Sequence, residues 1–149
     1  MESAQPICIR PGYGSEREQI LELLVESGLP VEDIVPGGPV QFLVAEHEGA
    51  MAGCIGVEFT FGHALIRSLS VRTTNRGAGI GSRLLEAAES LCHQQGVRDL
   101  FLLTLTAEPF LARRGYRRIE RTGAPDDIAA TSEFTSLCPV TSAFMTKRL

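Results

Sequence analysis

The stretch from Leu65 to Leu85 constrains the fold more than any other part of the chain. It reads as an apolar strand ending at Val71, a short polar turn, a glycine-rich loop over 76–81, and the first turns of a helix. Backbone N–H groups at a helix start, together with the positive end of the helix dipole, favour an anion, most often a phosphate. The stretch therefore predicts a strand–loop–helix unit built around an anion site. The alternative is a flexible turn that carries a basic residue, Arg76.

The glycine spacing in this loop excludes two common phosphate-binding loops. A dinucleotide fingerprint requires G-x-G-x-x-G, whereas Gly77, Gly79 and Gly81 alternate strictly and position 82 is serine. A P-loop requires lysine after its glycines, and none follows here. What remains is a pyrophosphate cradle of backbone amides, with Arg76 as a nearby positive charge.

Length and composition predict one domain spanning residues 1–149. Apolar residues make up 44% and charged residues 21%, and the formal net charge of −4 argues against a nucleic-acid partner. No apolar run reaches the roughly 18 residues of a membrane span, and Met1–Pro6 does not resemble the start of a secretory signal. Because the four cysteines form no C-x-x-C pair, we expect reduced thiols, a cytoplasmic location and no metal site.

The first half of the chain predicts a helix and an antiparallel meander. A strand over 7–10 precedes a helix that Ser15 caps, with Glu18 completing a capping box. Apolar runs over 40–46 and 51–59 read as a hairpin, and a second tight turn leads into the strand over 64–71.

The second half predicts a parallel crossover followed by shorter elements. The amphipathic helix from Ile80 ends at Gly96, and the apolar strand over 99–105 follows it. Thr106 can cap a short helix over 107–114. We expect further strands over 115–119 and 142–149, one or two helical turns over 126–131, and irregular backbone over 133–139. The predicted fold class is a single α+β domain with a mixed sheet of about six to seven strands.

Two motifs resemble the GNAT superfamily of N-acetyltransferases. One is Leu69-Ser70-Val71 followed by Arg76-Gly77-Ala78-Gly79-Ile80-Gly81, which is similar to the acetyl-CoA motif of that family. The other runs from Thr106 to Tyr116 and is similar to its A-x-x-F-x-x-x-x-G block. The resemblance implies a V-shaped split between the fourth and fifth strands, in which a thioester lies, with acetyl-CoA as co-substrate.

Narrower resemblances concern the substrate. The run Leu102–Ala107 looks like N-acetylglutamate synthases, and segments 55–58, 65–69 and 134–143 resemble a bacterial subgroup associated with arsenic-resistance operons. These imply a small, amino-acid-like amine as acceptor, including arsenic- or phosphorus-containing glutamate analogues. They imply no membrane partner, and a homodimer is compatible with them.

The resemblance assigns the cofactor to main-chain groups of the fourth strand and to the loop that follows it. The residues so assigned are Leu69, Ser70, Val71, Arg76, Gly77, Ala78, Gly79, Ile80, Gly81, Ser82, Thr104 and Phe110. The backbone N–H groups near 69–71 would polarise the thioester carbonyl as an oxyanion hole does.

The catalytic positions of the family are only partly filled. Leu111 stands where a tyrosine commonly protonates the leaving thiolate, and Leu65 stands where some relatives carry a glutamate base. Glu58 on the neighbouring strand is our candidate base, because an amine of pKa near ~10 must lose a proton before it attacks. The alternative is a solvated strand carboxylate. Ser142 or a water could replace the tyrosine as proton donor.

Three further side chains are candidates for acceptor binding or structure. Arg67 interrupts an apolar strand, so it either pairs with Glu58 or binds a substrate carboxylate. Cys138 is a candidate acceptor contact, with a buried structural thiol as the alternative. His63 reads as a surface residue.

The sequence therefore predicts an acetyl-CoA-dependent N-acetyltransferase. Two alternatives stay open: an acyl-CoA-binding sensor without efficient turnover, which Leu111 favours, and a transferase that acts on protein or peptide amines.

Overall fold

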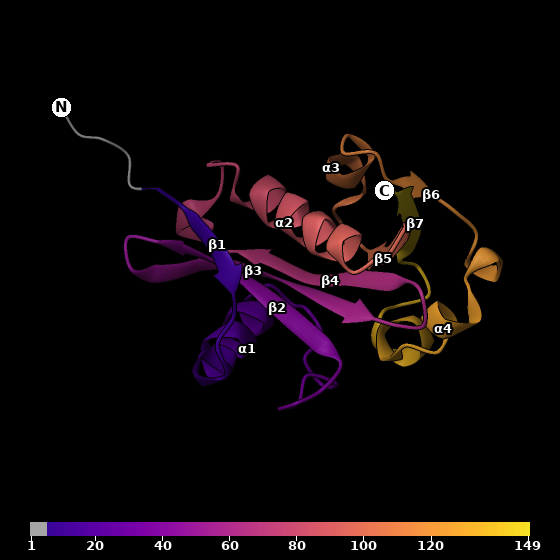
Figure 1. Cartoon of the computed structure of the whole chain (residues 1–149), viewed down its shortest axis with the longest axis horizontal. Coiled ribbons are helices and arrows are strands. Elements are labelled where there is room, and N and C mark those ends of the chain that lie inside the picture. Colours follow the sequence, from indigo (N-terminus) through magenta and orange to yellow (C-terminus); the bar gives the residue numbers. More distant parts are fainter. Residues whose placement is uncertain (1–5) are drawn as a thin grey trace.

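The computed structural model describes residues 6–149, and its centre is a seven-stranded mixed sheet (Figure 1). The strand order is β1-β2-β3-β4-β5-β7-β6. The strands are β1 (Cys8–Pro11), β2 (Val40–His47), β3 (Ala50–Phe59), β4 (Ala64–Val71), β5 (Asp99–Thr104), β6 (Arg117–Arg118) and β7 (Ala143–Arg148). The predicted α+β class and number of strands are confirmed. The interpretation of the N-terminus as lacking a secretory signal concerns residues that mostly lie outside the described part.

The two longer helices cover opposite faces of this sheet. Helix α1 (Arg17–Glu26) packs with Val44 and Cys54, whereas α2 (Ile80–Gln94) packs with Leu43 and Ile55. Successive residues of a strand point to opposite faces, so the two apolar clusters lie on either side of β2 and β3. Helix α3 (Glu108–Ala112) lies on the α2 side of the sheet, while α4 (Asp126–Ala129) lies on the opposite face, where Ile128 packs with Leu65 and Phe144 (Figure 1).

Strands β4 and β5 are parallel, and they pair only where they begin. Ala64 lies opposite Leu100 and Leu65 opposite Phe101, and no later residue of β4 has a partner on β5. On its other edge β5 pairs with β7 over its full length, from Asp99 to Thr104. The two central strands therefore diverge, as the resemblance implied.

A bulge lies in β4 beside this split. Cys54 pairs with Ser70 and Gly56 with Arg67, so a single residue of β3 faces two residues of β4, Ser68 and Leu69. Ser68 takes the left-handed conformation at φ 58°, and such a bulge redirects the strand locally. The pairing of β4 with β3 is thus irregular at the residues whose other edge borders the split.

The structure corrects several local expectations. Helix α1 begins at Arg17, and Ser15 lies in a 3₁₀ turn (Gly14–Glu16) before it. The capping contact is made by the Glu16 carboxylate, which accepts the backbone N–H of Tyr13 at 2.8 Å. Ser15 and Glu18 therefore do not form the predicted box, because Arg10 draws Glu16 into a paired position one turn earlier.

Two elements that follow β5 in the chain also differ from the sequence-based expectation. Thr106 does not cap α3; the backbone N–H of Ala107 instead donates to the Thr104 hydroxyl at 2.9 Å. Residues 133–137, expected to be irregular, form a π-helical turn (Glu133–Leu137). Within residues 6–149, no helix is long and apolar enough to cross a membrane.

Candidate functional site

A cavity of about 430 Å³ occupies the split between β4 and β5. Residues 66–69 of β4 form one wall, and residues 102–107 of β5 and the turn after it form the other. Leu85 and Leu111 line it from the α2 side, while residues 27–30 and 137–139 line it from the opposite side. The cavity is therefore lined by residues from both faces of the sheet.

The glycine loop lies at the end of β4 and leads into α2. Gly77 and Gly79 have φ of 88° and 76°, and Gly79 is the N-cap residue of the helix. A side chain is strained in this left-handed conformation, so glycine is favoured at both positions. The Arg76 Nε atom donates to the Val71 carbonyl at 3.2 Å. The start of α2 thus presents backbone N–H groups at an exposed loop, as an anion site requires.

Helix α3 supports the loop through an arginine that the sequence analysis did not single out. The Arg114 guanidinium donates to the Ser82 hydroxyl, with Nε at 3.0 Å, and to the Phe110 carbonyl at 2.9 Å. It also stacks on the Phe110 ring at 3.7 Å from the centroid. The loop that carries the predicted cofactor residues is therefore attached to the block that carries the second motif.

The other predicted cofactor residues divide between the cavity and the protein interior. Leu69 and Thr104 line the cavity. The Ser70 hydroxyl hydrogen-bonds the Ser27 hydroxyl at the end of α1, and Ile80 is buried in the core below α2. The side chains of Ser70 and Ile80 are thus used by the fold and do not line the cavity.

A buried ionic cluster lies next to the cavity and is formed by Arg67, Asp33, Glu58 and Glu133; we call it the Arg67 cluster. The Arg67 guanidinium has no exposed surface. It donates to the two Asp33 oxygens at 2.5 and 2.7 Å and to Glu58 Oε1 at 3.2 Å, and its Nη2 lies 3.4 Å from Glu133 Oε2. Three carboxylates therefore surround one guanidinium, and Arg67 pairs with Glu58 inside the protein.

Burial and charge perturb the groups of this cluster. Burial raises the pKa of Glu133 to about 7; Arg67 opposes this rise, and the carboxylates of Asp33 and Glu58 add to it. Burial alone would lower the pKa of Arg67, but the carboxylates around it raise that pKa above its usual range. Glu133 can therefore exchange a proton near neutral pH, which suits a group that works in acid–base chemistry.

The remaining predicted residues take up varied positions. Cys138 lines the cavity beside Glu133, and burial raises its thiol pKa to about 12, so the thiol is neutral at pH 7. Ser142 is 5% exposed and borders the cavity. Leu111 lines the same cavity and is 4% exposed. His63, expected at the surface, is only part-exposed, and its Nδ1 lies 2.8 Å from Asp127 Oδ2.

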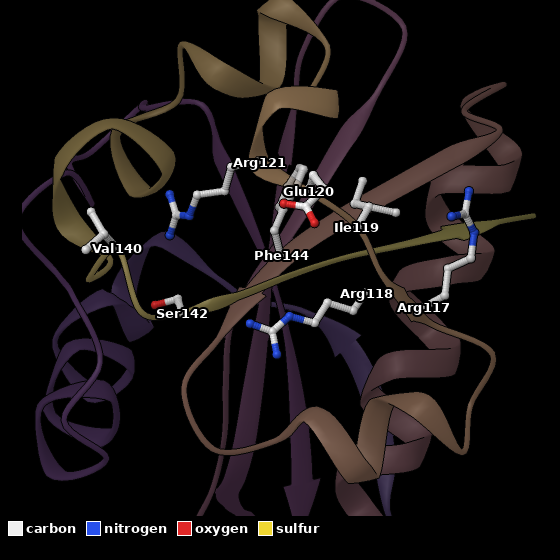
Figure 2. Close-up of a pocket in the computed structure, with 8 residues that line it drawn as sticks. All are labelled: Arg117, Arg118, Ile119, Glu120, Arg121, Val140, Ser142 and Phe144. Carbon is white, nitrogen blue, oxygen red and sulfur yellow. The ribbon is translucent and has the colours of Figure 1, made fainter.

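A second, more open cavity of about 760 Å³ lies between β6, β7 and the segment before β7 (Figure 2). Three arginines and one glutamate contribute to its lining, together with Ile119, Val140, Ser142 and Phe144. Ser142 is common to both cavities. The two cavities therefore adjoin at the start of β7.

Sequence reasoning missed Asp33, Glu133, Arg114 and the arginines of the second cavity. Arg67 itself was a signal, because a buried guanidinium needs a charged partner and further hydrogen bonds to replace its lost hydration. Asp33 belongs to the short segment over 31–35, whose pattern is compatible with one helical turn, and Glu133 belongs to the segment over 133–139, whose pattern predicts irregular backbone. Their contact with Arg67 depends on how those segments cross the sheet, which no local pattern encodes.

A split mixed sheet with a glycine loop and helix at one end of the split is the architecture that the resemblance to acetyltransferases implied. The model of the acetyltransferase (GNAT) domain family matches residues 38–118, more than half of the chain. The chain belongs to this family.

Two relatives carry acetyltransferase names. An uncharacterized N-acetyltransferase of Chlorobaculum tepidum is 41% identical over 88 residues, which cover 58% of this chain and 56% of that protein. An amino-acid acetyltransferase of Ralstonia nicotianae is 30% identical over 89 residues, 58% of this chain and 20% of that protein. The chain thus spans about half the length of the first and a fifth of the second.

The fold is similar to that of N-acetylglutamate synthase from Neisseria gonorrhoeae, whose crystal structure contains coenzyme A and N-acetyl-glutamate. The TM-score is 0.81 at 20% identity, and the alignment covers 100% of this chain and 36% of that protein. The similarity therefore extends over the whole described fold.

Proposed function

We propose that this chain transfers the acetyl group of acetyl-CoA to the primary amine of a small, amino-acid-like molecule. The observation that carries the proposal is the cavity of about 430 Å³ in the β4–β5 split, with the glycine loop at the end of β4. The GNAT family assignment supports the reaction type. The names of the Ralstonia and Neisseria proteins support the acceptor class.

The residues of the chain fit acetyl-CoA on two counts. The loop over 76–82 offers backbone N–H groups at the start of α2, which suit a pyrophosphate. The edge of β4 beyond Leu65 has no partner strand on the β5 side, and such an edge can accept an extended, amide-bearing chain as an added strand. When bound, acetyl-CoA would supply the acetyl group as a thioester, and the N–H groups over 69–71 would polarise its carbonyl.

The Arg67 cluster is our proposed route for the amine proton. Glu58 is the proposed base, and its pairing with Arg67 at 3.2 Å would hold its carboxylate in place. Glu133 would take up or release a proton near neutral pH, since its pKa is raised to about 7. Ser142, which borders the cavity, is the proposed donor to the leaving thiolate, because Leu111 has no proton to give.

The testing experiment measures free-thiol release from acetyl-CoA across a panel of amines. The panel includes L-glutamate, its phosphinic and arsonic analogues, and a peptide with a free N-terminus. We expect thiol release with the amino-acid-like amines and little with the peptide. Thiol release with the peptide alone would instead support a protein acetyltransferase. The arsonic arm tests the link to arsenic-resistance operons.

A sensor without efficient turnover is the second candidate, and Leu111 in the tyrosine position favours it. Thermal stabilisation by acetyl-CoA without thiol release from any amine would support the sensor and contradict the enzyme. We also propose a cytoplasmic location, which is consistent with four free cysteines.

A further inference from the structure

The cavity at β6 and β7 is positively charged within an acidic protein. Arg117, Arg118 and Arg121 line it against a single carboxylate, Glu120, whereas the chain as a whole has a formal net charge of −4. In Figure 2 the head groups of Arg118 and Arg121 both extend toward the side of the cavity where Ser142 lies. Its volume of about 760 Å³ is within the range of roughly 300–1,000 Å³ typical of small-molecule sites.

The two arginines nearest Ser142 differ in how they are held. The Arg121 Nη2 donates to the Pro139 carbonyl at 3.0 Å, its guanidinium lies 5.1 Å from the centre of the Phe134 ring, and its buried Nε has no hydrogen-bond partner among residues 6–149. Arg118 is 63% exposed at its side chain, and its contact with Glu108 is long, at 3.6 Å. One arginine is thus fixed in position, and the other can move to meet a ligand.

We propose that this cavity binds an oxyanion, a carboxylate or phosphonate, at the far end of the acceptor. This inference rests on the proposed transferase function and extends it by giving the acceptor a second, remote anchor. Because Ser142 borders both cavities, an acceptor held by Arg118 and Arg121 would extend past Ser142 with its amine toward the β4–β5 split. A guanidinium suits such a ligand, since its N–H groups match the geometry of carboxylate and phosphonate oxygens.

The alternative anchor, Arg67, is already used. Three carboxylates surround its guanidinium, which has no exposed surface, so an anionic ligand there would add a fourth negative charge beside Asp33, Glu58 and Glu133. An anion is therefore favoured at the arginine-lined cavity and disfavoured at the Arg67 cluster. The acceptor class that follows is a small amine with an oxyanion several bonds away.

The test is calorimetric titration of the full chain in the presence of coenzyme A. The probes are L-glutamate, 2-amino-4-phosphonobutanoate, and L-glutamine, which differs from glutamate only in lacking the remote charge. We expect Arg118→Gln to weaken binding of the two anionic probes about tenfold and to leave glutamine binding nearly unchanged. We expect Glu120→Gln to strengthen binding of the same two probes severalfold, because it removes the negative charge from the lining. Arg98→Gln, at an exposed arginine remote from the cavity lining, is the matched control and should change nothing.

The outcomes separate this inference from the proposed function. Equal binding of glutamate and glutamine by the wild type, no binding of either anionic probe, or unchanged binding by Arg118→Gln would each overturn the anion site. Failure of the transferase function would be seen elsewhere, as the absence of thiol release from acetyl-CoA with every amine of the panel. The anion site is supported if acetyl-CoA stabilises all the variants equally while Arg118→Gln loses affinity for the two anionic probes and not for glutamine.

Discussion

The guanidinium of Arg67 makes a two-pronged contact with the carboxylate of Asp33, at 2.5 and 2.7 Å. The two residues are 34 positions apart, and Arg67 lies in β4 whereas Asp33 lies in the connection between α1 and β2. The contact ties that connection to the strand that borders the β4–β5 cavity. Because Glu58 and Glu133 approach the same guanidinium, Arg67 neutralises part of a buried negative cluster.

The first prediction concerns Arg67→Met. This change leaves three carboxylates together without their cation, and breaking a buried ion pair in this way typically costs about 3–5 kcal/mol. We expect the free energy of unfolding to fall by that order at pH 7. The loss should be smaller at pH 5, where the buried carboxyls can take up protons. Urea denaturation at the two pH values measures both effects.

Arg10→Met is the matched control for this prediction. Arg10 also pairs with two glutamates, Glu16 and Glu46, but it does so near the surface, with 19% of its side chain exposed. Surface pairs are worth about 1 kcal/mol or less. If Arg67→Met lowered the free energy of unfolding no more than Arg10→Met does, the carboxylates of the Arg67 cluster would not depend on their buried cation.

The sequence predicts the framework of this site better than its charged interior. The hairpins and the strand–loop–helix unit follow local patterns, since alternation, turn glycines and the apolar face of α2 each act within a few residues. The split follows from resemblance alone. Asp33 and Glu133 could not be foreseen, because both belong to segments without periodicity that meet Arg67 only after the sheet has formed.

Local capping shows the same limit on a smaller scale. Ser15 and Glu18 have the spacing of a capping box, yet Glu16 makes the contact because Arg10 on β1 pairs with it through both carboxylate oxygens. An ion pair between residues six positions apart thus outweighs a capping preference worth about 1 kcal/mol. The arginine-lined cavity was missed for a related reason. Arg118 and Ser142 line one cavity only because β6 pairs with β7 at the edge of the sheet.

The second prediction tests the glycine loop through Gly79→Glu. We expect the variant to lose thermal stabilisation by acetyl-CoA, because it places a negative charge at the start of α2 where an anion should bind. Gly49→Glu is the control: Gly49 has φ of 78° against 76° at Gly79, and an added Cβ has open space at both. Left-handed strain of about 1–2 kcal/mol applies to each. If both variants were stabilised by acetyl-CoA as the wild type is, the loop would not be the cofactor site.

The third prediction tests Glu58 as the base. If its carboxylate accepts the amine proton, Glu58→Gln should lower kcat by roughly 10²–10⁴-fold and remove the acidic limb of the pH–rate profile. Glu86→Gln, at an exposed position on α2, should leave both unchanged. A Glu58→Gln variant with wild-type turnover would make Glu58 a structural partner of Arg67.

The fourth prediction concerns the pH dependence of stability. Burial raises the pKa of Glu133 from an ordinary 4.5 to about 7, so the folded state binds more protons than the unfolded state between those values. The contribution of Glu133 to the free energy of unfolding therefore falls as pH rises from about 4.5 to 7, and stays constant above. Glu133→Gln should remove this slope in urea denaturation curves recorded across that range.

Glu16 gives a control of opposite sign for the fourth prediction. Its hydrogen bond with Arg10 lowers the pKa of Glu16 to about 2, so its stabilising contribution is present above about 4.5 and is lost as pH falls toward 2. Glu16→Gln should therefore lower the free energy of unfolding by a constant amount above pH 4.5, remove the slope below pH 4.5, and leave the slope between 4.5 and 7 intact. An unchanged slope in Glu133→Gln would assign the proton uptake to another group of the Arg67 cluster.

The fifth prediction asks which group protonates the leaving thiolate. Ser142 borders the β4–β5 cavity, and so does Leu111, the residue in the tyrosine position. If the Ser142 hydroxyl delivers the proton, Ser142→Ala should lower kcat by about 10²-fold and leave stabilisation by acetyl-CoA unchanged. Ser136→Ala, at an exposed serine, should have no effect. Adding Leu111→Tyr to Ser142→Ala should restore part of kcat, because a phenol then replaces the lost donor in the same cavity. Wild-type kcat in Ser142→Ala would assign the proton to water, and Leu111 would then mark a family member that needs no side-chain acid.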